Sequence, residues 1–168
     1  MIDNKLVYFG HETLRKIASP VESFTPEIAE IASHMHEVMR KSRGIGLAAP
    51  QIDLSLRIVT IDLTHADGPA LTLINPVILA DSGDEYIFEE GCLSIPGVFR
   101  DVVRPESVTV RAYGLDGKTF ELDADGMFAR VLQHEIDHLD GILFIDRIDE
   151  HVRSELTKEL KKIKKMNR

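Results

Sequence analysis

Apolar residues recur at intervals of three and four positions in three segments of the chain, and this spacing predicts three amphipathic helices. The first helix follows Thr25-Pro26-Glu27, where a capping threonine, a proline suited to the first turn and an acidic residue favour a helix start. We expect it to end at residues 41–44. The second helix has its apolar positions between residues 127 and 139, and Gly141 is placed to end it. The third is expected over about residues 149–168.

Short runs rich in β-branched and aromatic residues predict strands between these helices. The runs cover residues 57–62, 71–74, 86–88, 102–103, 107–113, 119–122 and, after the second helix, 142–145. Leu115-Asp116-Gly117-Lys118 is typical of a hairpin turn. The order of helix, many short strands, helix, short strand and helix predicts an α+β fold, in which short antiparallel strands pack around the second helix.

The composition predicts a single folded domain over residues 1–168. Hydrophobic residues make up 43% and charged residues 29% of the chain, as in ordinary globular proteins, and no stretch reaches the ~20 apolar residues of a membrane helix. The start of the chain lacks the layout of a secretory signal. Because no apolar stretch of that length is present, we expect no membrane partner. The net charge of −8 argues against loose binding to nucleic acid, so we also expect no specific DNA partner. A single cysteine, Cys92, excludes an internal disulfide and favours a reducing, cytoplasmic setting.

The second helix contains the sequence Gln-His-Glu-Ile-Asp-His at residues 133–138. His134 and His138 are four positions apart, which on a helix places both imidazoles on one face, where they can reach a common metal ion. Glu135 follows the first histidine, as the general base does in the H-E-x-x-H pattern of metal-dependent hydrolases. The competing interpretation is a surface helix with two unrelated histidines. Val131 lies on the same face, and this apolar neighbour favours a buried site.

Two histidines leave a metal site incomplete, and three sources of a third ligand can be considered. The extended pattern H-E-x-x-H-x-x-G-x-x-H fails, because Phe144 occupies the place of the last histidine. A downstream glutamate is a second source, and it would indicate a metallo-endopeptidase. The candidates are Glu150, Glu155 and Glu159. The third source is Cys92, although a lone cysteine is more often a small buried hydrophobic residue. A structural metal site without catalysis is a further hypothesis.

Three short segments carry a more specific pattern. Residues 44–51 read G-I-G-L-A-A-P-Q, residues 90–94 read E-G-C-L-S, and residues 133–138 read Q-H-E-I-D-H. In this order and at these separations they resemble the three motifs of the peptide deformylases. Residues 14–18 and 142–148 are also similar to that family, so the resemblance covers most of the chain.

The resemblance implies an enzyme that removes the formyl group from the N-terminal formyl-methionine of nascent polypeptides, as part of N-terminal processing in protein biosynthesis. It implies that Cys92, His134 and His138 hold one divalent metal ion, with a water in the fourth position. Fe(II) is the metal expected in the cell, and Ni, Co or Zn can replace it in a purified sample. A thiolate ligand also offers a target for oxidation.

The resemblance also assigns the remaining catalytic roles. Glu135 corresponds to the general acid and base, which takes a proton from the water and delivers it to the departing amine. Gln51 and the backbone N–H of Leu93 correspond to the groups that stabilise the substrate oxygen. The metal-bound water is then the nucleophile that attacks the formyl carbon.

The methionine side chain of such a substrate needs an apolar pocket near the metal. Ile45, Leu93 and Val131 are the candidates for this pocket, together with Phe88, for which ordinary core packing is an equal alternative. Gly46 is a candidate for pairing its backbone with the main chain of the substrate.

The chain departs from the family pattern at two positions that border the motifs. Phe99 stands where many members carry an arginine, which leaves Arg100 or Arg104 as substitutes, and Arg43 stands where an acidic residue is frequent. The last helix is rich in basic residues, which suit a helix C-terminus and also suggest contact with ribosomal RNA. These residues are Lys158, Lys161, Lys162, Lys164, Lys165 and Arg168.

Overall fold

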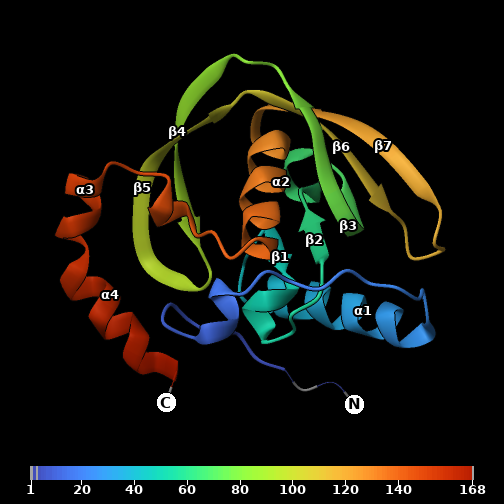
Figure 1. The fold of residues 1–168 in the computed structure, drawn as a ribbon, viewed down its shortest axis with the longest axis horizontal. Helices are drawn as coiled ribbons and strands as arrows, with labels where there is room; N and C mark the ends of the chain where they lie inside the picture. Colours follow the sequence, from blue (N-terminus) through green and yellow to red (C-terminus); the bar gives the residue numbers. More distant parts are fainter. Residues whose placement is uncertain (1, 3, 168) are drawn as a thin grey trace.

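A computed structural model describes residue 2 and residues 4–167 of the chain (Figure 1). The α-helices of this part are α1 (Pro26–Lys41), α2 (Gly126–Leu139), α3 (Glu150–Glu155) and α4 (Thr157–Lys164). The strands are β1 (Gly46–Ala48), β2 (Ile58–Asp62), β3 (Ala70–Asp81), β4 (Glu85–Cys92), β5 (Ile95–Pro105), β6 (Ser107–Tyr113) and β7 (Thr119–Asp125). None of the described helices is long and apolar enough to cross a lipid bilayer.

The strands form two antiparallel sheets that surround α2. Five strands make the larger sheet in the order β1-β2-β3-β6-β7, and β4 pairs with β5 in a separate hairpin. Figure 1 shows α2 in the middle of the molecule, with strands on both sides of it, α1 beside the β1–β2 end and α3–α4 next to β5. The fold is therefore the α+β arrangement that the sequence predicts, with antiparallel strands packed around the histidine-bearing helix.

Three apolar clusters hold this arrangement together. The first joins one face of the large sheet to Leu132, Ile136 and Leu139 of α2. The second joins α4 to the β4–β5 hairpin and to residues 143–145. The third packs the apolar stripe of α1 against β1 and β2. Because α2 is covered on nearly every side, its residues 129–139 are all buried, and its charged side chains must find partners inside the protein.

The predicted elements agree with the structure at most positions. The helix over residues 26–41, the strands at 57–62 and 107–113, and the turn at 115–118 are confirmed within a residue or two. The predicted strands at 71–74, 86–88, 102–103 and 119–122 lie inside longer strands. Apolar periodicity marks only the buried part of a strand, so exposed ends of this kind escape prediction.

Two expectations at the C-terminal end are wrong. Residues 142–145 form no strand; a 3-10 helix (Phe144–Asp146) occupies this place. Leu143, Phe144 and Ile145 are all buried in the second cluster, and the carboxylate of Asp146 accepts a hydrogen bond from the Leu143 N–H at 2.8 Å. The predicted helix over residues 149–168 begins at the Asp149 cap but divides at Leu156 into α3 and α4.

Gly141 ends α2 in a conformation that only glycine adopts without strain, with a φ of +72°. A Cβ atom at this position would lie 2.7 Å from the backbone oxygen of Arg15, whereas Gly83, with a φ of +73°, has open space around it. We expect Gly83→Ala to lower the free energy of unfolding by about 1 kcal/mol, through backbone strain alone. Gly141→Ala should lower it by at least a further ~1 kcal/mol, because strain and overlap combine. Urea unfolding of the two variants measures this difference, and equal losses would contradict it.

Candidate active site and metal centre

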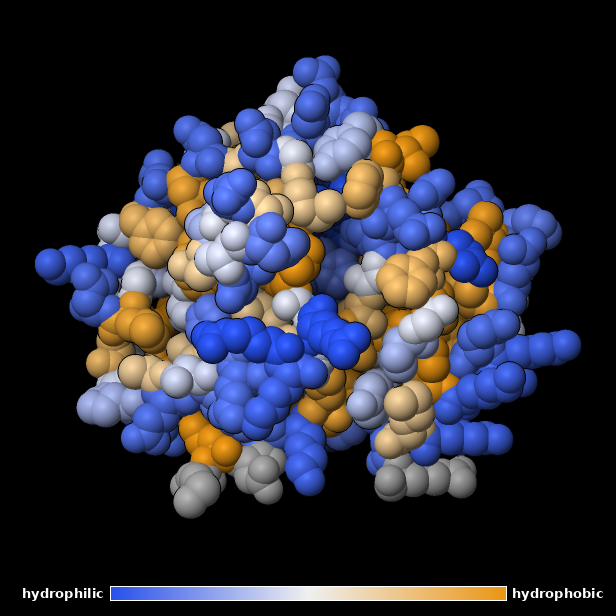
Figure 2. All heavy atoms as spheres, turned by 180° about the vertical axis from the view of Figure 1, so that it is seen from behind, coloured by the Kyte–Doolittle hydropathy of each residue, from blue (hydrophilic) through white to orange (hydrophobic). Residues whose placement is uncertain are grey.

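A cavity of about 530 Å³ opens between the segment after α1, the β4–β5 hairpin and α2. The residues predicted for the substrate pocket all line it: Ile45, Gly46, Phe88, Leu93 and Val131. Figure 2 shows a hollow near the middle of the face opposite to that of Figure 1, with hydrophilic and hydrophobic side chains around its rim. Three segments that are far apart in the sequence thus share one concave site, as is usual for sites that bind small ligands or peptide ends.

Cys92, His134 and His138 meet at this cavity. Their sulfur and ring-nitrogen atoms all lie within 4.8 Å of one another, and Sγ of Cys92 is 3.3 Å from Nε2 of His138. Among the residues that the structure describes, this is the only such group of three or more histidine, cysteine or acidic side chains. One sulfur and two imidazole nitrogens are a donor set suited to zinc or iron, and no glutamate of α3 or α4 joins it.

Local packing fixes where each of these three side chains points. Cys92 ends β4 at an irregularity in the hairpin register, next to Gly91. A Cβ atom on Gly91 would lie 2.5 Å from the ring of Phe99, so the glycine lets this ring pack against the strand. On α2, the ring of His134 stacks on that of Phe144, with 6.1 Å between the ring centroids. Phe144, which replaces the last histidine of the extended H-E-x-x-H-x-x-G-x-x-H pattern, therefore supports the ring of the candidate ligand His134.

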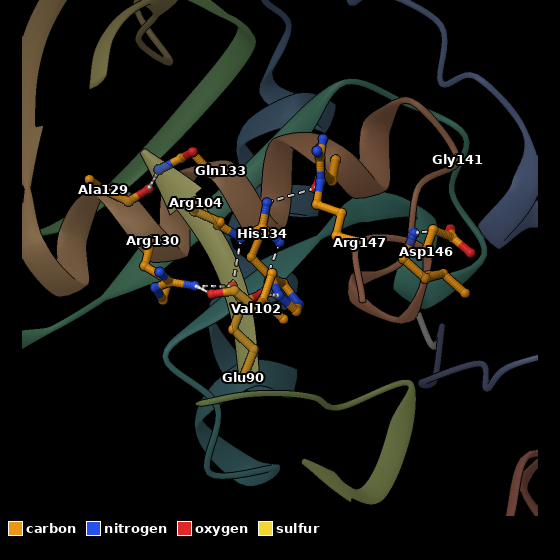
Figure 3. A network of polar contacts seen from close by, with 12 residues as sticks. Glu90, Val102, Arg104, Ala129, Arg130, Gln133, His134, Gly141, Asp146 and Arg147 are labelled. Carbon is orange, nitrogen blue, oxygen red and sulfur yellow. Dashed lines mark hydrogen bonds and ion pairs between the residues drawn. The ribbon is translucent and has the colours of Figure 1, made fainter. Parts of the chain in front are cut away.

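Glu90 forms a second layer behind His134 (Figure 3). Its Oε1 lies 2.8 Å from Nδ1 of His134, which leaves Nε2 of the ring for a metal. The same carboxylate accepts hydrogen bonds from Nε and Nη2 of Arg104 at 2.6 and 2.9 Å, and from Nη1 of Arg130 at 2.7 Å. Burial raises the pKa of Glu90, but the hydrogen bonds from His134 and Arg104 outweigh this effect and hold its pKa well below the usual range.

The network continues from Arg104 to Asp137 and the protein surface. Nη1 of Arg104 donates to Oδ2 of Asp137 at 2.9 Å, and Arg147 donates to both oxygens of the same carboxylate. Arg104 is 2% exposed and does not line the cavity. Arg100 is half-buried, donates to the backbone oxygen of Phe99 and does not line the cavity either. Neither arginine therefore lines the cavity as a substitute for the family arginine would. Phe99, which stands at the position of that arginine, does line it.

Glu135 points into the same region from α2, and it is 5% exposed. Its Oε2 has no hydrogen-bond partner within the described part of the chain. Burial raises the pKa of Glu135 to about 7, against the opposing influence of His134. A Cβ atom on Gly46 would lie 2.7 Å from Oε1 of Glu135, so the glycine leaves room for this carboxylate.

Gln51 is oriented by the backbone. Its Oε1 accepts a hydrogen bond from the Ala48 N–H at 2.9 Å. Its Nε2 therefore faces Ser94 Oγ at 3.3 Å and Cys92 Sγ at 3.5 Å, beside the cavity. The amide presents a donor at the sulfur of the candidate metal ligand. Leu93, the other residue predicted to stabilise the substrate oxygen, lines the cavity.

Comparison with known proteins decides the family. The family profile described as polypeptide deformylase matches residues 3–154. The chain belongs to this family, and it is a hydrolase. It is 46% identical to peptide deformylase 2 of Nitrosomonas europaea over 94% of this chain and 84% of that protein. It is 45% identical to the peptide deformylase of Acidobacterium capsulatum over 100% of this chain and 98% of that one.

Solved structures of the family share the fold. The crystal structure of a peptide deformylase from Legionella pneumophila matches with a TM-score of 0.89 and 44% identity, over 97% of this chain and 96% of that chain. The structure of a peptide deformylase from Synechococcus elongatus in complex with actinonin matches with a TM-score of 0.88 and 42% identity, over 95% and 87% of the two chains. The polypeptide deformylases are a metal-dependent family, and the cluster of Cys92, His134 and His138 is a possible metal site in this member.

Sequence reasoning missed the layer that surrounds the candidate ligands. Glu90 was part of a recognised motif without a role of its own, and Arg130 was not singled out at all. The available signal for Arg130 was its position on a helix with many apolar residues, because a charged residue buried in such a helix requires partners inside the protein. Arg130 finds them in Glu90 and in the backbone oxygens of Val102 and Tyr86.

Arg104 lies between two buried carboxylates, so its removal should destabilise the protein strongly. We expect Arg104→Met to lower the free energy of unfolding by about 3–5 kcal/mol, because Glu90 and Asp137 lose a shared buried partner. The control Arg111→Met breaks an exposed pair with Glu121 and should cost no more than ~1 kcal/mol. Urea unfolding of both variants in one buffer is the measurement. Similar losses for the two would show that the buried network contributes no more than a surface pair.

Proposed function

We propose that this cavity removes the formyl group from the N-terminal formyl-methionine of nascent polypeptides and releases formate. One observation carries the proposal: Cys92, His134 and His138 converge beside a buried carboxylate, Glu135, in a single cavity. Because the substrate arises during translation, we infer that the enzyme works in the cytoplasm, as one catalytic domain over residues 1–168.

The residues present fit a divalent metal. The hydrogen bond from Nδ1 of His134 to Glu90 leaves its Nε2 free to ligate, and Nε2 of His138 already faces the Cys92 sulfur. We propose Fe(II) in the cell, and the same nitrogen and sulfur donors can hold Ni, Co or Zn. When bound, such an ion would lower the pKa of its water toward ~7 and would polarise a carbonyl oxygen.

Glu135 is the residue proposed to move the proton. One of its oxygens has no other hydrogen-bond partner among the described residues, so it is available to the attacking water. The carboxylate can take the proton of that water as the oxygen attacks the formyl carbon. It can then deliver the same proton to the amine nitrogen as the C–N bond breaks, which returns Glu135 to its starting state.

Gln51 and Leu93 are proposed to stabilise the negative charge that develops on the formyl oxygen. The Ala48 N–H occupies Oε1 of Gln51, and this fixes the amide with its NH₂ group toward the site. A donor held in place before the reaction needs no reorganisation in the transition state. The backbone N–H of Leu93 is the second proposed donor.

The rest of the cavity suits the formyl-methionine residue and the chain that follows it. Ile45, Val131, Phe88 and Leu93 offer an apolar surface for the thioether side chain. Gly46 belongs to β1, which is the edge strand of the large sheet and lies against the cavity. An extended peptide can add to such an edge through backbone hydrogen bonds.

Substituting Glu135 tests the proton transfer. Glu135→Gln keeps the size of the side chain but removes its basicity, so kcat for formyl-Met-Ala-Ser should fall about 10²–10⁴-fold. The metal content per chain should stay at the wild-type value, because Glu135 is not among the proposed ligands. Glu159→Gln on α4 is the control and should leave both quantities unchanged. Full activity in Glu135→Gln would exclude this residue as the acid and base.

Contact with the ribosome through the C-terminal helix stays a prediction. Lys158, Lys161 and Lys165 are exposed, whereas Arg168 lies outside the described residues. Because Leu156, Leu160 and Ile163 belong to the core, truncating the helix would unfold its surroundings, and charge reversal is the cleaner test.

We expect the triple change of Lys158, Lys161 and Lys165 to glutamate to abolish co-sedimentation with ribosomes at low salt, since backbone phosphates attract cations. The control reverses three exposed cations elsewhere, namely Lys16, Arg111 and Lys118. Equal sedimentation of both triple variants would contradict ribosome contact by this helix.

A further inference from the structure

Arg43 occupies the rim of the cavity, directly before Gly44. Its backbone is left-handed, with a φ of +58°, which is uncommon for a residue other than glycine. Its N–H donates to the backbone oxygen of Arg40 at 3.0 Å, and the Gly44 N–H donates to that of Met39 at 2.9 Å. The end of α1 thus fixes the backbone of Arg43 at the rim.

Among the described residues, the guanidinium of Arg43 has no partner of opposite charge within reach. Its side chain is exposed, and no carboxylate of the described residues forms an ion pair or hydrogen bond with it. Arg40, three residues earlier on α1, lies 3.9 Å from Asp62 and outside the cavity. A cation kept unpaired at the edge of a binding site remains free to meet a charge carried by the ligand.

Apart from Glu89, the other charged side chains around the cavity already have partners or roles. Glu90 and Arg130 neutralise each other in the interior, and Glu135 is assigned to the reaction. Glu89 lies on β4 and is the remaining exposed charge of the lining. The wall formed by residues 43–46 therefore carries a local positive charge, on a chain whose net charge is −8.

A peptide that adds to the edge of β1, as proposed above, runs along this wall. Gly44 packs closely on Leu93, since a Cβ atom on Gly44 would lie 2.6 Å from Cδ1 of the leucine, so Arg43 stands beside the segment next to Cys92. An extended chain advances about 3.3–3.6 Å per residue, and its side chains alternate between the two walls. A side chain among the first residues after the formyl-methionine therefore comes within reach of a long arginine.

We propose that Arg43 is a specificity-determining residue, which favours substrates with an acidic side chain shortly after the formyl-methionine. The inference rests on the proposed function, because it concerns the peptide that this cavity deformylates. The carboxylate of the peptide meets the unpaired guanidinium, whereas a lysine at the same position is repelled.

Paired peptides test the proposal. Formyl-Met peptides with Asp or Lys at the second, third or fourth position are compared by kcat/KM at low salt, in the wild type and in Arg43→Glu. For at least one position, the Asp-to-Lys ratio should fall by about fivefold or more in Arg43→Glu, and the change should shrink at high salt. Arg40→Glu makes the same change in net charge outside the cavity, and its ratios should stay near those of the wild type.

Two outcomes distinguish a failure of the proposed role of Arg43 from a failure of the proposed deformylase function. Ratios that change by less than twofold at all three positions, or by the same amount in Arg40→Glu, would overturn the role of Arg43. Failure of the wild-type enzyme to release formate from the neutral peptide formyl-Met-Ala-Ser would instead overturn the proposed function. Deformylation of the neutral peptide together with unchanged ratios leaves the function standing and removes the specificity.

Discussion

The carboxylate of Glu90 accepts hydrogen bonds from side chains that reach it from β5 and from two positions on α2. It holds Nδ1 of His134 and binds the guanidiniums of Arg104 and Arg130. This one buried anion therefore ties the β4–β5 hairpin, which carries Cys92, to the helix that carries His134 and His138. The proposed metal site depends on that connection, because its ligands come from two elements that the larger sheet does not join.

Burying so many charges is unfavourable unless each one is matched. In this protein the matching is nearly complete: Arg104 bridges Glu90 and Asp137, and Arg147, nearer the surface, also binds Asp137. Among the buried carboxylates Glu135 is the exception, since one of its oxygens has no hydrogen-bond partner in the described part of the chain. An unmatched carboxylate beside the proposed ligands is costly for stability, and it suits a group that must exchange a proton during each turnover.

Sequence alone predicted the parts of this molecule that depend on local spacing. The interval between His134 and His138, the proline at the start of α1 and the glycine after α2 are local signals, and the structure agrees with the elements they predict. Thr25 occupies the N-cap position of α1, but its side chain does not make the capping hydrogen bond that the sequence predicts. The strand expected at residues 142–145 was wrong because a short apolar run has no period that separates a strand from a buried turn. The partners of Glu90 were missed because Arg104 and Arg130 are 14 and 40 residues away from it. No known sequence motif pairs residues at either of these separations.

Metal content and formate release, followed together in one anaerobic sample, test the central claim most directly. The wild-type protein is loaded with Fe(II), assayed with formyl-Met-Ala-Ser and analysed for bound metal beside Cys92→Ala and Glu155→Ala. The account predicts that the wild type and Glu155→Ala keep both the ion and the activity, and that Cys92→Ala loses both. Retention of metal and formate release in Cys92→Ala, or their loss in Glu155→Ala, would show that the sulfur is not the third ligand.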